Sequence, residues 1–343
     1  MSSHSALVSI LVPAYNAARY LPQLCESIQA QTYPHYEVLI GNDGSTDDTA
    51  AVAAPFLRDT RFRLLQWQPN RGLNVAWGLL LSAMKGEYWC CPGADDVLHP
   101  SFLERRVEVM ESNRQACLVH GPPELIDESG NPPQRGPGLL DLPTQLCPPR
   151  SLEVLLEHNV INQPSTLVRA SVTRQVLSFY RWEWAYSPDW FLWVLHAATG
   201  LDLIWDPQIL IKYRVHSSSL SCAPEKDFVR RAEVRLVPVV ALRTAAQFSQ
   251  WAAKSWSWWG RTLYRRWLRQ AAALKWKGGL RDEWLQLAAH AYYGARGRRA
   301  SLGIELARHA VGLLAADFRH RRAQGRQRFI VSGLAQIEDP IFR

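Results

Sequence analysis

The sequence lacks several features that would each assign the chain to a familiar class. No window offers about 18 or more uninterrupted apolar residues, so a membrane-spanning helix is not expected. The first apolar run, residues 7–12, follows neither a basic region nor a cleavage site, so we expect no secretory signal peptide. The six cysteines include no CxxC pair and no zinc-like spacing, which fits a reducing compartment.

Two nucleotide-binding signatures are also missing. No GxGxxG follows the first predicted strand, and no GxxxxGK[ST] occurs anywhere in the chain. The signatures of a Rossmann dinucleotide site and of a P-loop are therefore absent. A nucleotide site in this protein would instead use carboxylates, which accept hydrogen bonds from base or ribose donors and hold a metal against a diphosphate.

Charge is distributed unevenly along the 343 residues. Residues 1–224 contain 16 Lys and Arg against 22 Asp and Glu, whereas residues 225–343 contain 23 against 9. The net charges of these parts are −6 and +14, and together they give the +8 of the whole chain. The basic part suggests an anionic partner, whether a membrane surface, nucleic acid or a phosphorylated substrate.

Short β-prone runs alternate with helical segments over the first 120 residues. Strands are predicted at 7–13, 36–41, 62–67, 88–91 and 116–120, with helices at about 18–31, 49–58, 73–84 and 100–113. This alternation indicates βαβ units and a mainly parallel α/β sheet covered on both faces. Beyond the Pro- and Gly-rich residues 121–150, which form either an acceptor-side flap or an inert excursion, further strands are predicted at 165–169, 201–205 and 209–216.

Two adjacent carboxylates, Asp95 and Asp96, follow the strand predicted at 88–91. In open α/β sheets ligands bind at the carboxyl ends of the strands, and oxygen ligands there suit Mg²⁺ or Mn²⁺ carrying a diphosphate. The alternative is that the pair forms a turn and caps the helix that starts near Pro100. Asp43 is expected at the same edge of the sheet.

Four motifs in order resemble those of the family 2 glycosyltransferases, inverting sugar-nucleotide enzymes with the GT-A fold. They are Pro13-Ala14-Tyr15-Asn16, Asn42-Asp43-Gly44-Ser45-Thr46-Asp47, Asn70-Arg71-Gly72 and Ala94-Asp95-Asp96. Each is weak alone, but their order and spacing within residues 7–120 make the resemblance strong.

The resemblance implies a role for each motif. The nucleotide pocket would be lined by Pro13, Ala14, Tyr15, Asn16, Asn70 and Gly72. Asp43 would contact the base, Asp95 the ribose or the metal, and Asp96 the metal on the diphosphate. The chain departs from the family pattern at Asn42, where many relatives carry Asp, and at Gly93, where the longer acidic motif begins with Asp.

Ser187-Pro188-Asp189 precedes an aromatic and aliphatic run that predicts a helix. Asp189 could simply favour the positive end of that helix. The position is also similar to the acidic pair that precedes an apolar helix in the family, in which the second acid is the catalytic base. Asp189 is therefore the predicted base, and Pro188 replaces the first acid. Inverting transfer needs one base to take the proton of the acceptor hydroxyl.

Tyr213-Arg214-Val215-His216 resembles the YRxH segment that ends the transferase domain in bacterial members of the family. There the His can complete the metal shell, and a neutral imidazole suits Mn²⁺. The predicted metal ligands are therefore Asp96, Asp95 and His216. The alternative is that His216 is ordinary polar surface.

Beyond Pro224 the chain is predicted to be helical to near Arg328. Trp256, Trp259, Leu263 and Trp267 recur at helical spacing, with basic residues on another face. These helices either pack against the catalytic domain or lie in a membrane interface. A nucleic-acid module that reads sequence is not expected.

The sequence thus predicts a GT-A domain over 1–223, with a nucleotide half at 1–121 and an acceptor half at 122–223, and a basic helical region over 224–343. The predicted activity is metal-dependent inverting transfer of one sugar from a nucleotide-sugar, preferably UDP-linked, to a hydroxyl of a glycan or lipid-linked acceptor in cell-surface polysaccharide synthesis. The predicted location is cytoplasmic, with contact to the inner face of the membrane through the basic helices, and the oligomeric state is left open. The alternatives are a nucleotidyltransferase and a catalytically weak scaffold.

Overall fold

The computed structural model describes residues 5–132, 145–180, 187–217, 219, 237–238 and 240–254. The chain divides into two compact units, Met1–Ser257 and Trp258–Arg343, and every described residue belongs to the first. This division differs from the boundary expected at residue 223. The predicted Trp- and Arg-bearing helices beyond residue 254 lie outside the described residues.

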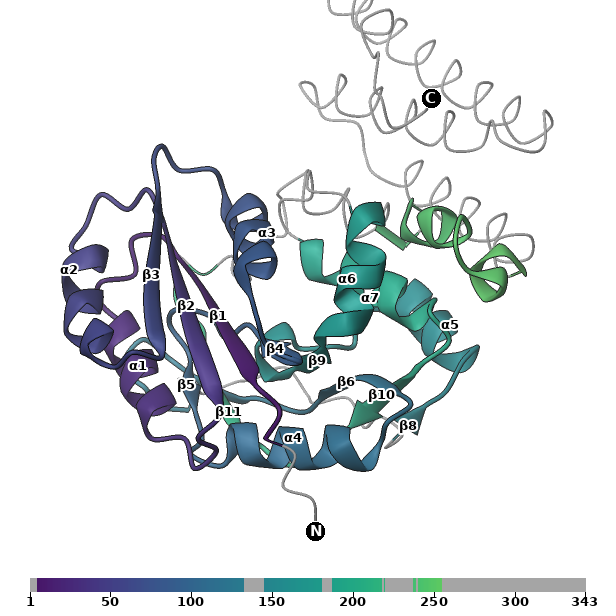
Figure 1. The fold of residues 1–343 in the computed structure, drawn as a ribbon, viewed down its shortest axis with the longest axis horizontal. Helices are drawn as coiled ribbons and strands as arrows, with labels where there is room; N and C mark the ends of the chain where they lie inside the picture. Colours follow the sequence, from purple (N-terminus) through teal and green to yellow (C-terminus); the bar gives the residue numbers. More distant parts are fainter. Residues whose placement is uncertain are drawn as a thin grey trace, which may run out of the picture. The chain divides into compact units, whose positions relative to one another are not determined.

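The strands of the described residues form one eight-stranded and one three-stranded sheet (Figure 1). The strands are β1 (Val8–Ala14), β2 (Tyr36–Asp43), β3 (Phe62–Trp67), β4 (Tyr88–Cys90), β5 (Val97–Leu98), β6 (Ala116–His120), β7 (Glu124–Ile126), β8 (Gln145–Leu146), β9 (Leu167–Arg169), β10 (Asp202–Trp205) and β11 (Ile211–Arg214). Their order is β3-β2-β1-β4-β9-β6-β10-β8 in the large sheet and β5-β11-β7 in the small one.

Most pairings in the large sheet are parallel, as the sequence predicts. β1 runs parallel to β2 and β4, β2 to β3, and β6 to β10. β9 is antiparallel to both β4 and β6, and β8 is antiparallel to β10. The carboxyl ends of β1, β2 and β4 therefore meet at one edge of the sheet, which is where the polar motifs were expected.

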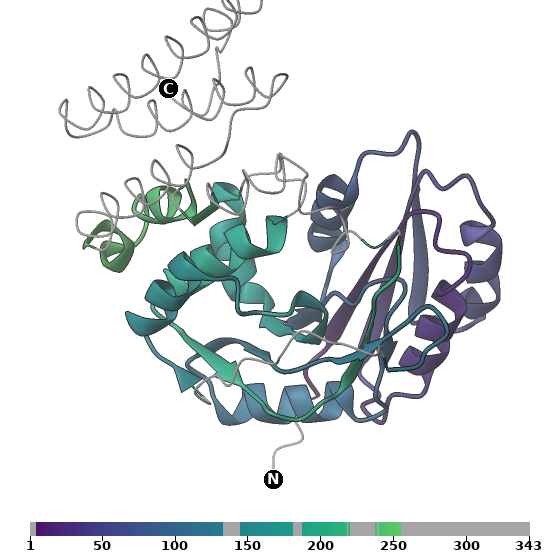
Figure 2. The same ribbon diagram turned by 180° about the vertical axis from the view of Figure 1, so that it is seen from behind.

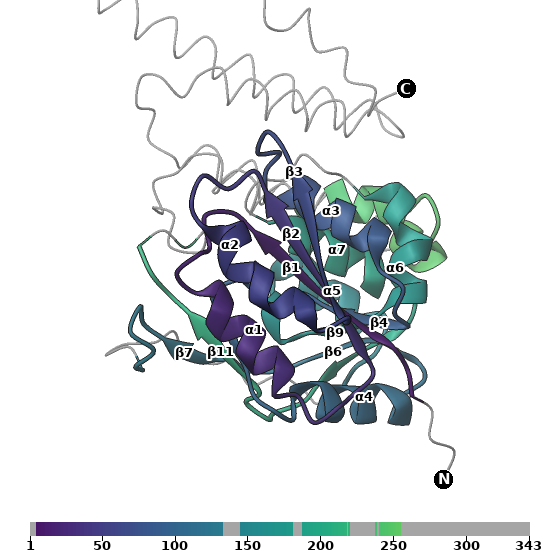
Figure 3. The same cartoon turned by 60° about the vertical axis from the view of Figure 1, so that its left-hand side comes forward.

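Helices cover both faces of the sheet. They are α1 (Leu21–Gln29), α2 (Thr49–Ala53), α3 (Leu73–Ala83), α4 (Phe102–Ser112), α5 (Arg150–Glu157), α6 (Ala170–Val176) and α7 (Pro188–Ala197). α1 and α2 lie on one side of β1–β3 and α3 lies on the other (Figure 3). α5, α6 and α7 gather near the part of the sheet that holds β6, β9 and β10 (Figure 2).

Successive side chains of a strand point to opposite faces of the sheet, and this explains why the core has one layer on each face. Val8, Ile10 and Val12 of β1 are fully buried in one core cluster with apolar residues of α1 and α4. On the opposite face, the ring of Trp89 from β4 lies between Trp77 of α3 and Trp193 of α7, with ring centroids 5.8 and 6.1 Å away. This period of two is the pattern of a strand buried on both sides.

Several short elements were not predicted. β5 and β8 have two residues each and β7 has three, too few for a periodic signal. β7 and β8 also fall within the expected loop 121–150, of which residues 133–144 lie outside the described residues. α6 follows β9 directly and lacks a turn residue that would mark its start. Among the described helices, none is both long enough and apolar enough to cross a bilayer.

A buried ion pair fastens α4 to the end of β10. Arg106 Nη1 lies 2.9 Å from Asp206 Oδ2, and both side chains are almost completely buried. Arg105 Nε reaches the same oxygen at 3.0 Å from a more exposed position. Burial lowers the pKa of Arg106 to about 10, and Asp206 opposes that shift. Removal of one partner from such a pair leaves an uncompensated buried charge.

We expect Asp206→Asn to lower the free energy of unfolding by about 3–5 kcal/mol, because Arg106 then stays buried without a counter-charge. The control is Glu153→Gln, which breaks the exposed pair with Arg150 and should cost at most about 1 kcal/mol. Urea denaturation followed by tryptophan fluorescence compares them. Equal losses of unfolding free energy in the two variants would show that the buried pair contributes no more to stability than the exposed pair.

Candidate functional site

The carboxylate of Asp43 organises the first part of the candidate site. Asp43 ends β2, and its Oδ1 and Oδ2 accept the backbone N–H groups of Arg71 and Gly72 at 2.9 and 2.8 Å. Asn70 Nδ2 donates to the Asp43 carbonyl at 2.9 Å. Gly72 takes φ of 87°, which favours glycine, and α3 starts immediately after it. The structure therefore brings Asp43, Asn70 and Gly72 together, as the motif order predicts.

A second turn lies beside this cluster. Pro13 and Ala14 pair with Gly41 and Asn42 across β1 and β2, so the turn after β1 adjoins the one after β2. Asn16 has a left-handed backbone with φ of 51°, and its Oδ1 accepts Thr46 N at 2.8 Å. Tyr15, which lies between Ala14 and Asn16 in this turn, is 52% exposed.

Asp95 and His216 meet although they are 121 residues apart. His216 Nε2 lies 2.9 Å from Asp95 Oδ2, with side-chain exposures of 12% and 28%. β5 follows Asp96 and pairs with β11, which carries Tyr213 and Arg214, so the small sheet brings the two segments together. The alternative that His216 is ordinary polar surface does not describe this partly buried, paired ring.

Asp96 has a different environment from its neighbour. It is fully buried, and its Oδ2 accepts Gly93 N at 2.7 Å while its Oδ1 accepts Arg214 N at 3.1 Å. Burial and the charge of Asp95 hold the pKa of Asp96 well above its ordinary value. Its carboxylate ties the 93–96 turn to β11, so of the two acids Asp95 has the accessible oxygen. The alternative, that this pair caps α4, is not observed, because Ser101 directly precedes the helix and makes no side-chain cap bond.

Gly93 has little space around it. A Cβ built there would lie 2.5 Å from Asp95 Oδ1 and 2.9 Å from Asp96 Oδ2. An acidic side chain at this position, as in the longer family motif, would require both carboxylates to shift. Glycine at 93 therefore agrees with the observed positions of Asp95 and Asp96.

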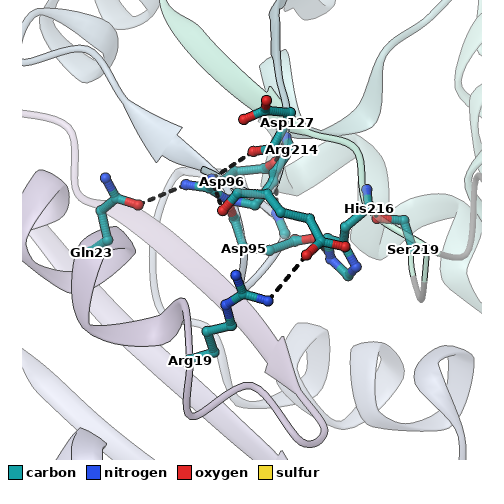
Figure 4. A network of polar contacts seen from close by, with 10 residues as sticks. Arg19, Gln23, Asp95, Asp96, Asp127, Arg214, His216 and Ser219 are labelled. Atoms are coloured by element: carbon teal, nitrogen blue, oxygen red, sulfur yellow. Dashed lines mark hydrogen bonds and ion pairs between the residues drawn. The ribbon is translucent and has the colours of Figure 1, made fainter. Parts of the chain in front are cut away.

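Arg214 connects the segments around this site, and its importance was not predicted (Figure 4). Its side chain is nearly buried and donates to the carbonyls of Asp95 and Asp127 at 2.8 and 2.9 Å and to Gln23 Oε1 at 2.7 Å. Its guanidinium also lies 4.7 Å from the ring centroid of Tyr20. The available signal was weak, because β11 reads Ile-Lys-Tyr-Arg and its other charged residue, Lys212, is exposed.

Asp189 lies on a different element, at the start of α7. Ser187 precedes that helix without a side-chain cap bond, and Pro188 is its first residue. Asp189 Oδ2 accepts Asn159 Nδ2 at 3.0 Å. Burial raises the pKa of Asp189, while donation from Asn159 and from the Trp190 N–H opposes the rise. A carboxylate with a raised pKa is a better proton acceptor near neutral pH, which suits the predicted base.

Comparison with known proteins agrees with this arrangement. Residues 9–169 match the model of the family described as "Glycosyl transferase family 2". A protein of Haemophilus influenzae described as an uncharacterized glycosyltransferase is 29% identical over 223 residues, which cover 63% of this chain and 67% of that protein. A similar protein of Rickettsia prowazekii is 29% identical and covered to 66%. The chain thus spans about two thirds of the length of these curated relatives.

Solved structures show the same fold. S. aureus TarS residues 1–349 in complex with UDP-GlcNAc superpose with a TM-score of 0.63 at 17% identity, over 95% of each chain. A mannosyltransferase of Pyrobaculum calidifontis in complex with GDP-Man and Mn²⁺ superposes with a TM-score of 0.51 at 16% identity, over 91% of this chain and 88% of that one. The fold is therefore GT-A. The family-model match over residues 9–169 and the relatives described as glycosyltransferases identify the protein as a glycosyltransferase. Over residues 9–169, somewhat less than half of its length, the chain is similar to glycosyltransferase family 2.

We expect Arg214→Lys to destabilise the protein by about 2–4 kcal/mol, because an ammonium cannot reach acceptors on three separate segments. Hydrogen exchange should also become faster in residues 124–132, which the guanidinium holds through the Asp127 carbonyl. Lys212→Arg on the same strand is exposed and serves as the control. Unchanged exchange at 124–132 would contradict the connecting role of Arg214.

Proposed function

We propose that this protein is a metal-dependent inverting transferase that moves a single sugar from a UDP-linked donor to an acceptor hydroxyl. The observation that carries the proposal is the 2.9 Å approach of His216 Nε2 to Asp95 Oδ2. Two residues predicted as ligands from separate motifs meet at the sheet edge that also holds the Asp43 cluster. A structural role alone does not require this pairing of a carboxylate with an imidazole.

The donor class is supported by the fold neighbours. TarS was solved with UDP and with UDP-GlcNAc, and the Pyrobaculum enzyme with GDP-Man. In this chain Asp43 is the candidate for contact with the base, since each carboxylate oxygen keeps one lone pair beyond the backbone bond that it accepts. Tyr15, exposed beside it, offers a ring on which a base can stack.

The donor set at Asp95 and His216 fits a divalent metal. Carboxylate oxygen and imidazole nitrogen are ordinary ligands of Mn²⁺, and carboxylate oxygen also suits Mg²⁺. Within the described ranges no three His, Cys, Asp or Glu side chains cluster as a complete metal site. Diphosphate oxygens and water would therefore have to complete the shell. When bound, the metal supplies positive charge that neutralises the leaving diphosphate.

Asp189 provides the base chemistry. In an inverting reaction the acceptor hydroxyl attacks the anomeric carbon from the side opposite the leaving nucleoside diphosphate. The C–O bond to the diphosphate breaks, the new glycosidic bond forms, and the hydroxyl proton passes to the Asp189 carboxylate. The raised pKa of Asp189 means that activity should fall as the pH drops through that pKa, because a protonated carboxyl cannot accept the proton.

The acceptor is proposed from the family resemblance, as a glycan or a lipid-linked sugar in cell-surface polysaccharide synthesis. Transfer of one sugar is favoured over processive synthesis because Arg266-Trp267 lacks the glutamine of the QxxRW segment. Peripheral contact with the cytoplasmic face of the membrane would use basic helices that lie outside the described residues. No observation in the described part of the chain favours a nucleotidyltransferase or an inactive scaffold.

The proposal predicts that UDP binding depends on Asp95 and His216, the proposed metal ligands. In isothermal titration of the full chain with Mn²⁺, His216→Ala and Asp95→Ala should each weaken UDP affinity about 10- to 100-fold, and chelation should have a similar effect on the unmodified protein. His99→Ala is the control, because that exposed ring bonds only with Ser101 among its described partners. If the UDP affinity is the same after chelation and in His216→Ala, the metal assignment is refuted.

A second prediction separates binding from chemistry. Asp189→Asn should lower turnover of UDP-sugars about 10²- to 10⁴-fold, the range that a general base contributes, with unchanged affinity for UDP. Release of UDP from UDP-GlcNAc and UDP-glucose, with water as the acceptor, is a suitable assay. Asp202→Asn, which removes a carboxylate from the start of β10, is the matched control. Full turnover in Asp189→Asn would exclude this residue as the base.

A further inference from the structure

The side chain of Asn159 contacts the proposed base from another part of the fold. It follows the end of α5, and its Nδ2 lies 3.0 Å from Asp189 Oδ2 across 30 residues of sequence. The other end of the amide is also placed, since Asn159 Oδ1 accepts Ile161 N at 3.4 Å. This second bond orients the amide so that its NH₂ group, and not its oxygen, faces the carboxylate.

The backbone around Asp189 is held independently of this contact. The Tyr180 hydroxyl lies 2.9 Å from both the Pro188 carbonyl and Asn74 Oδ1, so it links the first turn of α7 to α3. Trp190 Nε1 donates to the Leu155 carbonyl at 2.7 Å and fixes α7 against α5. The helix start is thus held on two sides, and the Asn159 amide acts on the Asp189 side chain itself.

We propose that Asn159 is a positioning residue for the base Asp189, and that it holds the carboxylate in one orientation toward the acceptor hydroxyl. This inference rests on the function proposed above. Because the amide is neutral and only donates at this contact, it orients the carboxylate without adding a charge to the acceptor side of the site. A lysine or arginine in its place would hold the carboxylate ionised and weaken it as a base.

The charged groups nearby do not replace this interaction. α5 and α6 pack against α7, and the ionisable side chains of these three helices, beside Asp189 itself, are Arg150, Glu153, Glu157, Arg174 and His196. Arg150 pairs with Glu153, and Arg174 donates to the Gly86 carbonyl. His196 is held by Thr173 and the Leu192 carbonyl. Among the contributions that oppose the effect of burial on the pKa of Asp189, the Asn159 amide is the largest, ahead of the backbone and of the Trp193 side chain.

The test is a pH titration of the Asp189 carboxyl carbon by NMR, in the full chain labelled with [4-¹³C]aspartate. The Asp189 signal is assigned by its absence in Asp189→Asn. We expect Asn159→Ala to raise the titration midpoint by about one pH unit, because the ionised form loses a charge-assisted hydrogen bond. Asn159→Asp keeps the volume and should raise the midpoint further through like-charge repulsion, and it serves if Asn159→Ala folds poorly.

The matched control is Asn162→Ala in the same segment. Asn162 Oδ1 accepts Ser165 N at 3.2 Å and has no described contact with Asp189, so this variant should lose stability and keep the wild-type midpoint. An equal shift of the titration midpoint in Asn162→Ala would mean that Asn159 acts only by supporting the loop. An unchanged midpoint in both Asn159 variants would overturn the inference directly.

Turnover measured on the same proteins separates this inference from the proposed function. If Asp189→Asn abolishes UDP-sugar turnover and Asn159→Ala moves the acidic limb of the turnover profile to higher pH, both stand. If Asp189→Asn abolishes turnover but the profile of Asn159→Ala matches wild type, the base stands and the positioning role fails. If Asp189→Asn retains turnover, the base assignment fails, and the NMR midpoints then report only an ordinary hydrogen bond.

Discussion

The candidate site depends most on the buried guanidinium of Arg214. A cation this deeply buried is stable only if polar groups surround it, and here three chain segments supply them: the Asp95 carbonyl, the turn at Asp127, and Gln23 of α1. The backbone N–H of the same residue binds Asp96 Oδ1. Two residues later the chain places His216 against Asp95. The arginine and the short β5–β11 pairing therefore explain how two distant motifs come together at the site proposed to bind the metal.

Most of the fold could be predicted from the sequence, because buried strands leave apolar runs and the carboxyl ends of parallel strands share one edge. Asp43 ends β2 and Asp95 follows β4, so both lie at the edge that this rule indicates. It could not predict that β9 would enter antiparallel between β4 and β6, because a three-residue strand has no directional signal of its own. It also could not find Asn159, whose partner lies 30 residues away and whose type is common in loops.

Asp43 and Asp96 each have a structural role besides the binding role predicted for them. Each carboxylate is buried and accepts two backbone N–H bonds, which compensate for the loss of hydration. In this way Asp43 shapes the turn before α3, and Asp96 holds the turn that presents Asp95. Substitution of either residue changes the shape of the site along with its charge, so loss of binding in such variants does not by itself identify a ligand contact.

The Asp43 cluster and the proposed base Asp189 are connected through the interior of the protein. Asp43 holds Gly72, Gly72 starts α3, Asn74 of α3 lies 2.9 Å from the Tyr180 hydroxyl, and that hydroxyl lies 2.9 Å from the Pro188 carbonyl next to Asp189. The rings of Trp77, Trp89 and Trp193 pack along the same path. Protein interiors of this kind are close-packed and deform little. The separation between the proposed nucleotide contact Asp43 and the proposed base Asp189 is thus set by core packing rather than by surface loops.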